Sequence, residues 1–317
     1  MIDAHHHLWD LGAVHYPWLM ARGVERFFGD PTPIQRNYLI DEFRAEASAQ
    51  GIAASVHIQV GAEDSLAEAR WVQAVADANP DWPLKQVVFV DLTADDLDTQ
   101  LDAFQALPSV VGLRQIVGRA PGEDAVTGTN TLLDNPAFLA GLQKAGQRGL
   151  SFDLQLIPEL MVKTADLLAR APDTAVALCH AGSPHDRSNA GLTHWAGELA
   201  ALSDLPQVRC KLSGLGMFDH DWITENFRPI VETCLDQFSP NRVMFGSNFP
   251  VDKLYSDYAT LIQAFRDLVP REMHQAVFNN TAADFYSMFQ DSATGSLEAK
   301  KNGLTWREII PDEQLPW

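Results

Sequence analysis

The chain begins Met1-Ile-Asp-Ala-His-His-His-Leu-Trp-Asp10, a short apolar stretch with three consecutive histidines. Alternate side chains of a β-strand share a face, so His5 and His7 would point one way and His6 the other. Two imidazoles on one face can converge on a metal ion or a substrate oxygen, although they can also be incidental or structural histidines. The apolar neighbours favour a native strand end, and we expect a functional site around His5 and His7.

Seven further apolar, β-branched runs follow, and helical patterns separate them. Near-continuous apolar runs are typical of parallel strands that are buried on both faces. About eight βα repeats without a Gly-rich phosphate loop predict a single-domain α/β protein, a (β/α)8 TIM barrel over residues 1–290. The strands are expected at residues 2–7, 54–60, 86–92, 110–116, 150–156, 175–180, 208–212 and 243–247.

Two segments depart from this alternation. Residues 13–38 form a long aromatic insertion after the first strand, with Trp18 near its start. In a barrel this loop would cover the mouth, so we expect a lid or pocket wall in which Trp18 contacts the substrate. Residues 291–317 follow the last helix and contain Trp306 and Trp317. We expect this C-terminal extension to pack on the barrel or on a partner subunit of a homo-oligomer.

Composition narrows the class of protein. The 317 residues carry a formal net charge of −19, which argues against nucleic acid and anionic membranes as partners. No run approaches the roughly 20 apolar residues of a membrane-spanning helix, and the start lacks a signal-peptide pattern. Three cysteines, Cys179, Cys210 and Cys234, are too few for a disulfide framework or a thiolate zinc site. We expect a cytoplasmic protein that acts on a small molecule.

Polar residues recur at the ends of the predicted strands. Functional residues of a barrel gather at the C-terminal ends of its strands. Unpaired polar groups are costly to bury, so packing alone explains this recurrence poorly. Besides the first-strand histidines, the candidates are His57, Arg114, Gln155, His180, Lys211 and Asn248, with Asp252 shortly after the last strand.

Three of these candidates have definite alternatives. A lone histidine such as His180 is more often a satisfied core residue, but the His5/His7 pair favours a functional one. The planar fork of Arg114 suits a carboxylate or sugar hydroxyls, or an ion pair with Asp153 or Asp91. A buried Lys211 would be a substrate anchor, a Schiff-base nucleophile or half of an internal ion pair.

Five motifs occur in an order that resembles the amidohydrolase superfamily: Asp3-x-His5-x-His7-Leu-Trp, Gly112-Leu-Arg114, Cys179-His180-Ala-Gly, Lys211-Leu-Ser-Gly214 and Phe245-Gly-Ser-Asn248-Phe-Pro250. The chain is most similar to the amidohydrolase-related branch, which includes sugar-acid lactonases and 2-pyrone-4,6-dicarboxylate lactonase. The resemblance implies a hydrolase that opens a lactone or related cyclic ester of a sugar acid or small carboxylic acid. It also implies that His5 and His7 are first-strand metal or substrate ligands, and that His180 is the sixth-strand histidine.

One position departs from the family pattern. Asn248 stands where the family usually has an aspartate that acts as base and metal ligand, and a carboxamide serves poorly in either role. Two mechanisms follow. Either one divalent ion such as zinc is held by His5, His7 and His180, or the same histidines donate hydrogen bonds to the carbonyl oxygen without metal.

Both mechanisms need a base for the attacking water, and we expect Asp252 to replace the missing aspartate. The alternative for Asp252 is a loop or helix-capping aspartate ahead of Lys253. The substrate's polar end is expected at Arg114 and Lys211, with His57 and Gln155 beside them. Two alternatives remain open. One is a C–C lyase on the same barrel, either a decarboxylase or a Lys211 Schiff-base aldolase. The other is a barrel that binds a sugar acid without turning it over.

Overall fold

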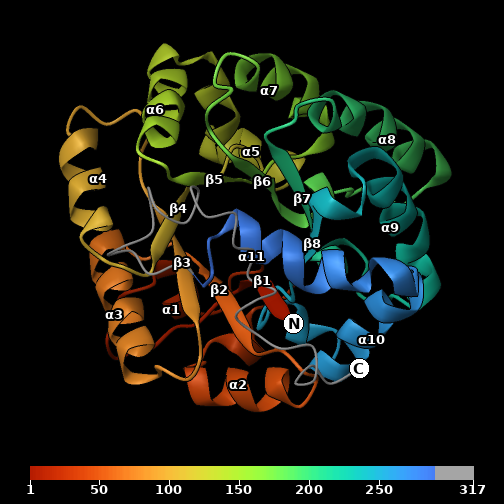
Figure 1. The fold of residues 1–317 in the computed structure, drawn as a ribbon, viewed down its shortest axis with the longest axis horizontal. Coiled ribbons are helices and arrows are strands. Elements are labelled where there is room, and N and C mark those ends of the chain that lie inside the picture. The colour runs from red at the N-terminus through yellow and green to blue at the C-terminus, as the bar shows by residue number, and fades with distance from the viewer. Residues whose placement is uncertain (290–317) are drawn as a thin grey trace, which may run out of the picture.

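The computed structural model describes residues 1–289 and confirms the (β/α)8 barrel. Eight parallel strands pair in chain order, each with the next (Figure 1). Each of the eight predicted strands is present, although several are shorter than expected. The strands are β1 Ile2–His6, β2 Ala54–Ile58, β3 Leu84–Phe89, β4 Val110–Arg114, β5 Ser151–Leu154, β6 Val176–Leu178, β7 Val208–Leu212 and β8 Val243–Phe245.

Backbone hydrogen bonds just beyond β8 bring the first and last strands together. The N–H of His7 donates to the carbonyl of Phe249, and the N–H of Asn248 donates to the carbonyl of His5, both at 2.7 Å. The buried Asp3 stiffens this seam, since its Oδ1 accepts the N–H of His5 at 3.0 Å. The seam therefore places the first-strand histidines beside Asn248.

Helices form the outer layer of the barrel and bury one apolar face against the strands (Figure 1). Most strands are followed by one long helix, while short helices occupy two of the loops on the mouth side. The helices are α1 Pro17–Met20, α2 Ile40–Ser48, α3 Ser65–Ala78, α4 Leu97–Gln105, α5 Pro121–Thr127, α6 Pro136–Gln147, α7 Met161–Leu168, α8 Asn189–Ser203, α9 Thr224–Phe238, α10 Tyr258–Leu268 and α11 Thr281–Phe285.

The last of these helices, α11, covers the N-terminal end of the barrel and lies near the centre of Figure 1. Ala282 and Tyr286 pack with Ile2 and Val56 in an apolar cluster that is separate from the main core. The hydroxyl of Tyr286 then reaches inward and donates to Asp153 Oδ1 at 2.7 Å. The floor of the barrel is therefore closed by the C-terminal part of the described chain.

The aromatic insertion lies beside the C-terminal ends of the strands, as predicted. Its helix α1 carries Trp18, whose indole N–H donates to the carbonyl of Val60, two residues beyond β2, at 2.7 Å. Trp9 and Tyr38 form an antiparallel bridge that joins the two ends of the insertion. These contacts fix the insertion over the mouth of the barrel.

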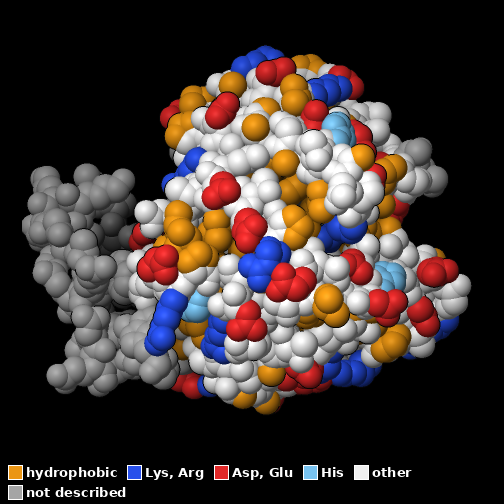
Figure 2. All heavy atoms as spheres, turned by 90° about the vertical axis from the view of Figure 1, so that its right-hand side faces the viewer, with side chains coloured by type: hydrophobic (Ala, Val, Ile, Leu, Met, Phe, Trp, Pro, Cys, Tyr) orange, Lys and Arg blue, Asp and Glu red, His pale blue; other side chains and the backbone are white. Residues whose placement is uncertain are grey.

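On the face in Figure 2, acidic and basic side chains are scattered among apolar ones and do not form a patch of one charge. Within residues 1–289, no helix has the length and apolar character needed to cross a bilayer. The predicted C-terminal extension, residues 291–317, lies outside the described residues, so its packing stays a prediction.

Candidate active site

A cavity of about 290 Å³ opens at the C-terminal ends of the strands, beneath the insertion. Most of the side chains that the sequence singles out line this cavity, and the others are buried behind its wall. The lining residues are His7, Trp18, Arg114, Gln155, His180 and Asn248, and the buried ones are His5, His57, Lys211 and Asp252.

His7, Asn248 and Asp252 form a continuous hydrogen-bonded chain on one side of the cavity. His7 Nδ1 lies 2.8 Å from the carbonyl oxygen of Ile58, and His7 Nε2 lies 3.2 Å from Asn248 Oδ1. Asn248 Nδ2 donates to Asp252 Oδ2 at 2.6 Å, and Asp252 Oδ1 accepts the N–H of Gly216 at 3.1 Å. The residue predicted as the base thus contacts the Asn248 amide and does not contact the cavity itself.

Burial sets the protonation of this chain. It raises the pKa of Asp252 to about 7, and hydrogen bonds from Asn248 and Gly216 only partly oppose the shift. It lowers the pKa of His7 to about 3, with the positive charge of Arg114 as the next cause. His7 is therefore a neutral imidazole at physiological pH, and Asp252 titrates near neutrality.

His180 stands on a tight turn that ends β6. Its φ is +56° and that of Ala181 is +50°, so the chain leaves the strand two residues earlier than predicted. Ser213 Oγ lies 3.0 Å from His180 Nδ1 and accepts the backbone N–H of His180 at 3.3 Å. A Cβ on Gly214 would lie 2.4 Å from His180 Nδ1, so the position needs glycine. With Nδ1 engaged by Ser213, Nε2 is the nitrogen available to the cavity.

His5 lies beneath the cavity and connects the other two histidines. Its ring centroid is 5.2 Å from that of His7 and 4.6 Å from that of His180. Both of its ring nitrogens are buried without a hydrogen-bond partner. Burial, followed by the positive charge of Lys211, lowers the pKa of His5 well below its usual range. The three histidine rings are thus neighbours, His7 and His180 in the cavity lining and His5 beneath it.

Lys211 belongs to a buried network under these histidines. Its Nζ lies 2.5 Å from Asp153 Oδ2 and 2.8 Å from the carbonyl oxygen of Ala4. The side chain is fully buried and does not line the cavity. Of the three predicted roles, the structure therefore shows the internal ion pair. It does not support a substrate anchor or a Schiff-base nucleophile, because a substrate carbonyl has no access to Nζ.

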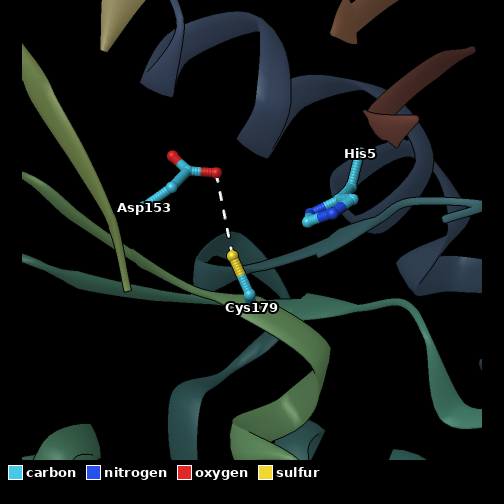
Figure 3. A group of neighbouring side chains, drawn as sticks. All are labelled: His5, Asp153 and Cys179. Carbon is cyan, nitrogen blue, oxygen red and sulfur yellow. Dashed lines mark hydrogen bonds between the residues drawn. The ribbon is translucent and has the colours of Figure 1, made fainter. Parts of the chain in front are cut away.

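The predicted three-histidine metal set is not the group that the fold assembles. Among residues 1–289, the cluster with potential ligand atoms all within 4.8 Å of one another consists of His5, Asp153 and Cys179 (Figure 3). His7 lies outside this cluster, and as a neutral imidazole it can donate to only one of its two neighbouring oxygens, those of Ile58 and Asn248. Of the predicted set, this cluster contains only His5.

The donors of this cluster fit a divalent ion poorly. Asp153 supplies the only carboxylate of the cluster. Its Oδ2 already binds Lys211, and its Oδ1 already accepts the hydroxyl of Tyr286. Burial, together with the charge of Asp153, raises the pKa of the Cys179 thiol to about 12, whereas a metal needs the thiolate. A dication beside the Lys211 ammonium would also be repelled by it. The Lys211 ammonium group already balances the negative charge of Asp153 in this cluster.

Arg114 and Gln155 form the wall opposite the His7 chain. The Arg114 guanidinium donates from Nη2 to Gln155 Oε1 and from Nη1 to the carbonyl of Gln59, the latter at 3.4 Å. Its Nε is buried without a partner. Neither of the ion pairs considered for Arg114, with Asp153 or Asp91, is present among the described residues. Both side chains line the cavity.

His57 points away from the cavity, into the layer between β2 and α3. Its Nδ1 accepts the N–H of Leu8 at 3.1 Å, and its Nε2 lies 3.6 Å from Glu68 Oε1. Glu68 also accepts the N–H of Val60 at 2.8 Å. The predicted role as a substrate ligand does not fit this position, where His57 links β1, β2 and α3.

Three charged residues at the mouth were missed by the sequence analysis. Arg26 Nη2 and Arg119 Nη1 both contact Glu123 Oε1, at 2.7 and 3.1 Å, and both arginines line the cavity. The Arg26 guanidinium also lies over the ring of Trp18, 5.6 Å from its centroid. Their positions in the sequence could have indicated them, because Arg26 lies in the insertion and Arg119 lies shortly after the fourth strand, and both segments are expected at the mouth.

Two sequence relatives resemble the chain over most of its length. A Sinorhizobium fredii protein named "Uncharacterized protein y4mH" is 35% identical over 295 residues, an alignment that covers 90% of this chain and 98% of that protein. The L-fucono-1,5-lactonase of Burkholderia multivorans is 27% identical over 308 residues and covers 90% of this chain and 96% of its own.

Solved structures share the fold. An amidohydrolase from Burkholderia multivorans with bound zinc has a TM-score of 0.75 at 24% identity, covering 90% of this chain and 98% of that one. The 5-carboxyvanillate decarboxylase of Sphingomonas paucimobilis has a TM-score of 0.60 at 14% identity, with the same coverage. The family described as amidohydrolase matches residues 2–288. The chain therefore belongs to the amidohydrolase family, as its motifs suggest.

Proposed function

We propose that the protein is a hydrolase that opens a lactone or a related cyclic ester by attack of water. The observation that carries this proposal is the convergence of His7, His180, Asn248 and Arg114 on one cavity at the mouth of the barrel. The lactonase relative, at 27% identity, supports the same class of reaction. A small-molecule substrate and a cytoplasmic location, both expected from the sequence, are part of this proposal.

We assign the role of base to His180. Ser213 Oγ accepts the backbone N–H of His180 and has a second lone pair that can accept Nδ1–H. In the tautomer that this mechanism requires, Nδ1–H donates to Ser213 and Nε2 carries the lone pair. Nε2 would then accept the proton from water as the water attacks the lactone carbonyl carbon. The proton later passes to the leaving alkoxide, which completes ring opening.

Asn248 and Arg114 stabilise the substrate in this scheme. The Asn248 amide lines the cavity and is held in place by Asp252 on one side and His7 on the other. Asp252 thus acts as a positioning residue, and its raised pKa makes the orientation of the amide sensitive to pH. Arg114 offers charged N–H donors for the developing oxyanion or for an acidic group of the substrate.

The proposed reaction uses only groups of the chain. A divalent ion would supply a polarised water, but the cluster of His5, Asp153 and Cys179 fits such an ion poorly for the reasons given above. We therefore expect lactone hydrolysis to survive dialysis against a chelator such as dipicolinate, with metal content measured on the same sample. Loss of activity that zinc restores would contradict the metal-free mechanism.

The proposed function is tested by proton release from a panel of lactones. His180→Gln and His7→Gln are expected to lower kcat by about 100- to 10,000-fold, the usual contribution of acid–base groups. His194→Gln, an exposed histidine on α8, is the matched control and is expected to retain activity. Equal turnover in all three variants would remove the histidines from the mechanism.

A decarboxylase is the second candidate, because Arg114 suits a substrate carboxylate and a decarboxylase shares the fold. Release of carbon dioxide without ring opening would favour it. The aldolase alternative requires a Schiff base at the buried Lys211, and borohydride trapping of a pyruvate adduct would be needed to support it. Tight binding without turnover over the whole panel would favour the sugar-acid-binding barrel.

A further inference from the structure

The cavity is a locally positive site in an acidic protein. Three arginines line it, Arg26, Arg114 and Arg119, whereas no Asp or Glu among residues 1–289 does. The whole chain carries a formal net charge of −19. The arginines are therefore the residues of permanent charge that line the cavity.

Arg114 lacks a counter-ion at the inner end of the cavity. The side chain is only 5% exposed, and it donates hydrogen bonds to the neutral oxygens of Gln155 and Gln59. Among the described residues it forms no ion pair, and its Nε has no partner at all. Asp153 and Glu68 act on the Arg114 charge only from beyond ion-pair distance. A buried guanidinium without a directly paired anion is costly in free energy, so the position suits an anion brought by a ligand.

Arg26 and Arg119 repeat this excess of positive charge at the outer end. Both donate to the same oxygen, Glu123 Oε1, so one carboxylate serves two guanidinium groups. Each guanidinium carries five N–H donors, and the contacts with Glu123 use one nitrogen on each. Both arginines line the cavity, and the Arg26 guanidinium also lies over the ring of Trp18.

We propose that the substrate is a small lactone that carries a carboxylate, and that Arg26 and Arg119 select it by that group. This inference rests on the proposed function and narrows its substrate class. A neutral sugar lactone would find amide acceptors at Gln59, Gln155 and Asn248, but it would bring no anion to the three guanidinium groups. An acidic lactone instead meets paired N–H donors at the mouth and a buried guanidinium at Arg114.

The test compares matched substrates that differ only in charge: γ-butyrolactone with a γ-carboxylate, a γ-sulfonate or a γ-carboxamide. Arg26→Met and Arg119→Met are expected to lower kcat/KM for the carboxylate by about 10- to 100-fold, mainly through KM, since hydrogen bonds to a charged group are lost. Turnover of the carboxamide is expected to stay the same. Arg26→Lys should restore part of the loss.

Arg228→Met is the control for the loss of one positive charge. Arg228 lies on α9 and pairs with Glu225 on the outer surface. It is expected to leave both substrates unaffected. If Arg26 and Arg119 only hold the insertion in place, their variants would slow the carboxylate and the carboxamide equally, and the inference would be wrong. A clear preference for the sulfonate over the carboxylate would likewise overturn the assignment of a carboxylate.

Binding measured without turnover separates this inference from the proposed function. Calorimetric titration with glutarate is expected to show binding that weakens about 10-fold or more in Arg26→Met, whereas glutaramide binds neither protein measurably. Arginine-dependent glutarate binding without turnover of any lactone would overturn the hydrolase and leave the acid-binding site supported. Equal kcat/KM for neutral and acidic lactones would overturn the acid preference while the hydrolase stands.

Discussion

Asn248 Nδ2 donates a hydrogen bond of 2.6 Å to Asp252 Oδ2, so a carboxylate outside the cavity orients an amide that lines it. This relationship replaces the aspartate that the family motif would place in the cavity. It moves the negative charge one side chain further from the substrate. Asp252 is then expected to act on the geometry of Asn248, and a direct role in proton transfer is not needed.

Asp252→Asn is expected to lower kcat by about 100-fold, because a misplacement of about 1 Å in a catalytic amide has an effect of this size. The substituted amide can donate where the carboxylate accepted, which turns the Asn248 side chain around. Binding of the lactone should change little, so the effect falls on kcat. Steady-state kinetics by proton release checks this, and a rate within twofold of the parent would remove Asp252 from the mechanism.

The stability of the protein should depend on Asp252 in a defined pH window. The pKa of Asp252 rises from its ordinary 3.8 to about 7 in the folded protein. Between these values the native state keeps the proton and the unfolded chain has lost it, so the contribution to stability is present below about pH 4 and lost as pH rises to about 7. The Asp252→Asn variant has no titrating group at this position, so it does not lose this contribution to stability.

The unfolding free energy of Asp252→Asn should therefore rise relative to that of the parent between pH 4 and pH 7, by up to about 1.4 kcal/mol per pH unit. Above pH 7 the difference between the two proteins should stay constant. Urea unfolding at a series of pH values measures the difference. Asp267→Asn, an exposed position on α10, serves as control and should follow the parent throughout. A constant difference between Asp252→Asn and the parent would contradict the shift.

Lys211→Met should destabilise the fold by about 3–5 kcal/mol, because it leaves the buried Asp153 carboxylate without its cation. Adding Asp153→Asn removes the unpaired charge, so the double variant should recover most of that loss. A double-mutant cycle of unfolding free energies gives the coupling between the two residues. Additive losses would show that Lys211 and Asp153 do not compensate each other's charge.

Gly214→Ala should disturb His180, since the added Cβ would lie 2.4 Å from its Nδ1 at a φ of +61°. The left-handed backbone alone costs about 1–2 kcal/mol, and displacement of the imidazole adds a loss of kcat of about 100-fold. Gly128→Ala is the matched control. Its φ is +69° but no atom lies within 4 Å of the added Cβ, so it should lose stability and keep its activity.

The barrel could be predicted because its signal is repeated along the chain, in apolar strands and in polar residues at their ends. The same argument found His7, His180, Arg114 and Asn248, which do line the cavity. It could not distinguish these residues from Lys211, since strand alternation leaves open whether a polar side chain faces the mouth or another buried charge. The ion pair with Asp153 shows that Lys211 faces another buried charge, and this pair is visible only in the structure.

Loop residues were beyond this argument for a different reason. Arg26 and Arg119 meet at Glu123 although they come from separate loops, and no periodicity links them. Asp252 was singled out by its closeness to Asn248 in the sequence, and this closeness is real. However, the turn after β8 directs its side chain away from the cavity, which spacing alone does not reveal.

The hydroxyl of Tyr286, which donates to Asp153, has a consequence for how the chain is made. A chain still growing on the ribosome can hold all eight strands and both first-strand histidines before residue 286 has emerged. Until then Asp153 has Lys211 but not its second donor, and the N-terminal end of the barrel is open to water. The order of synthesis thus makes the floor of the barrel one of the last parts of the described chain to be completed.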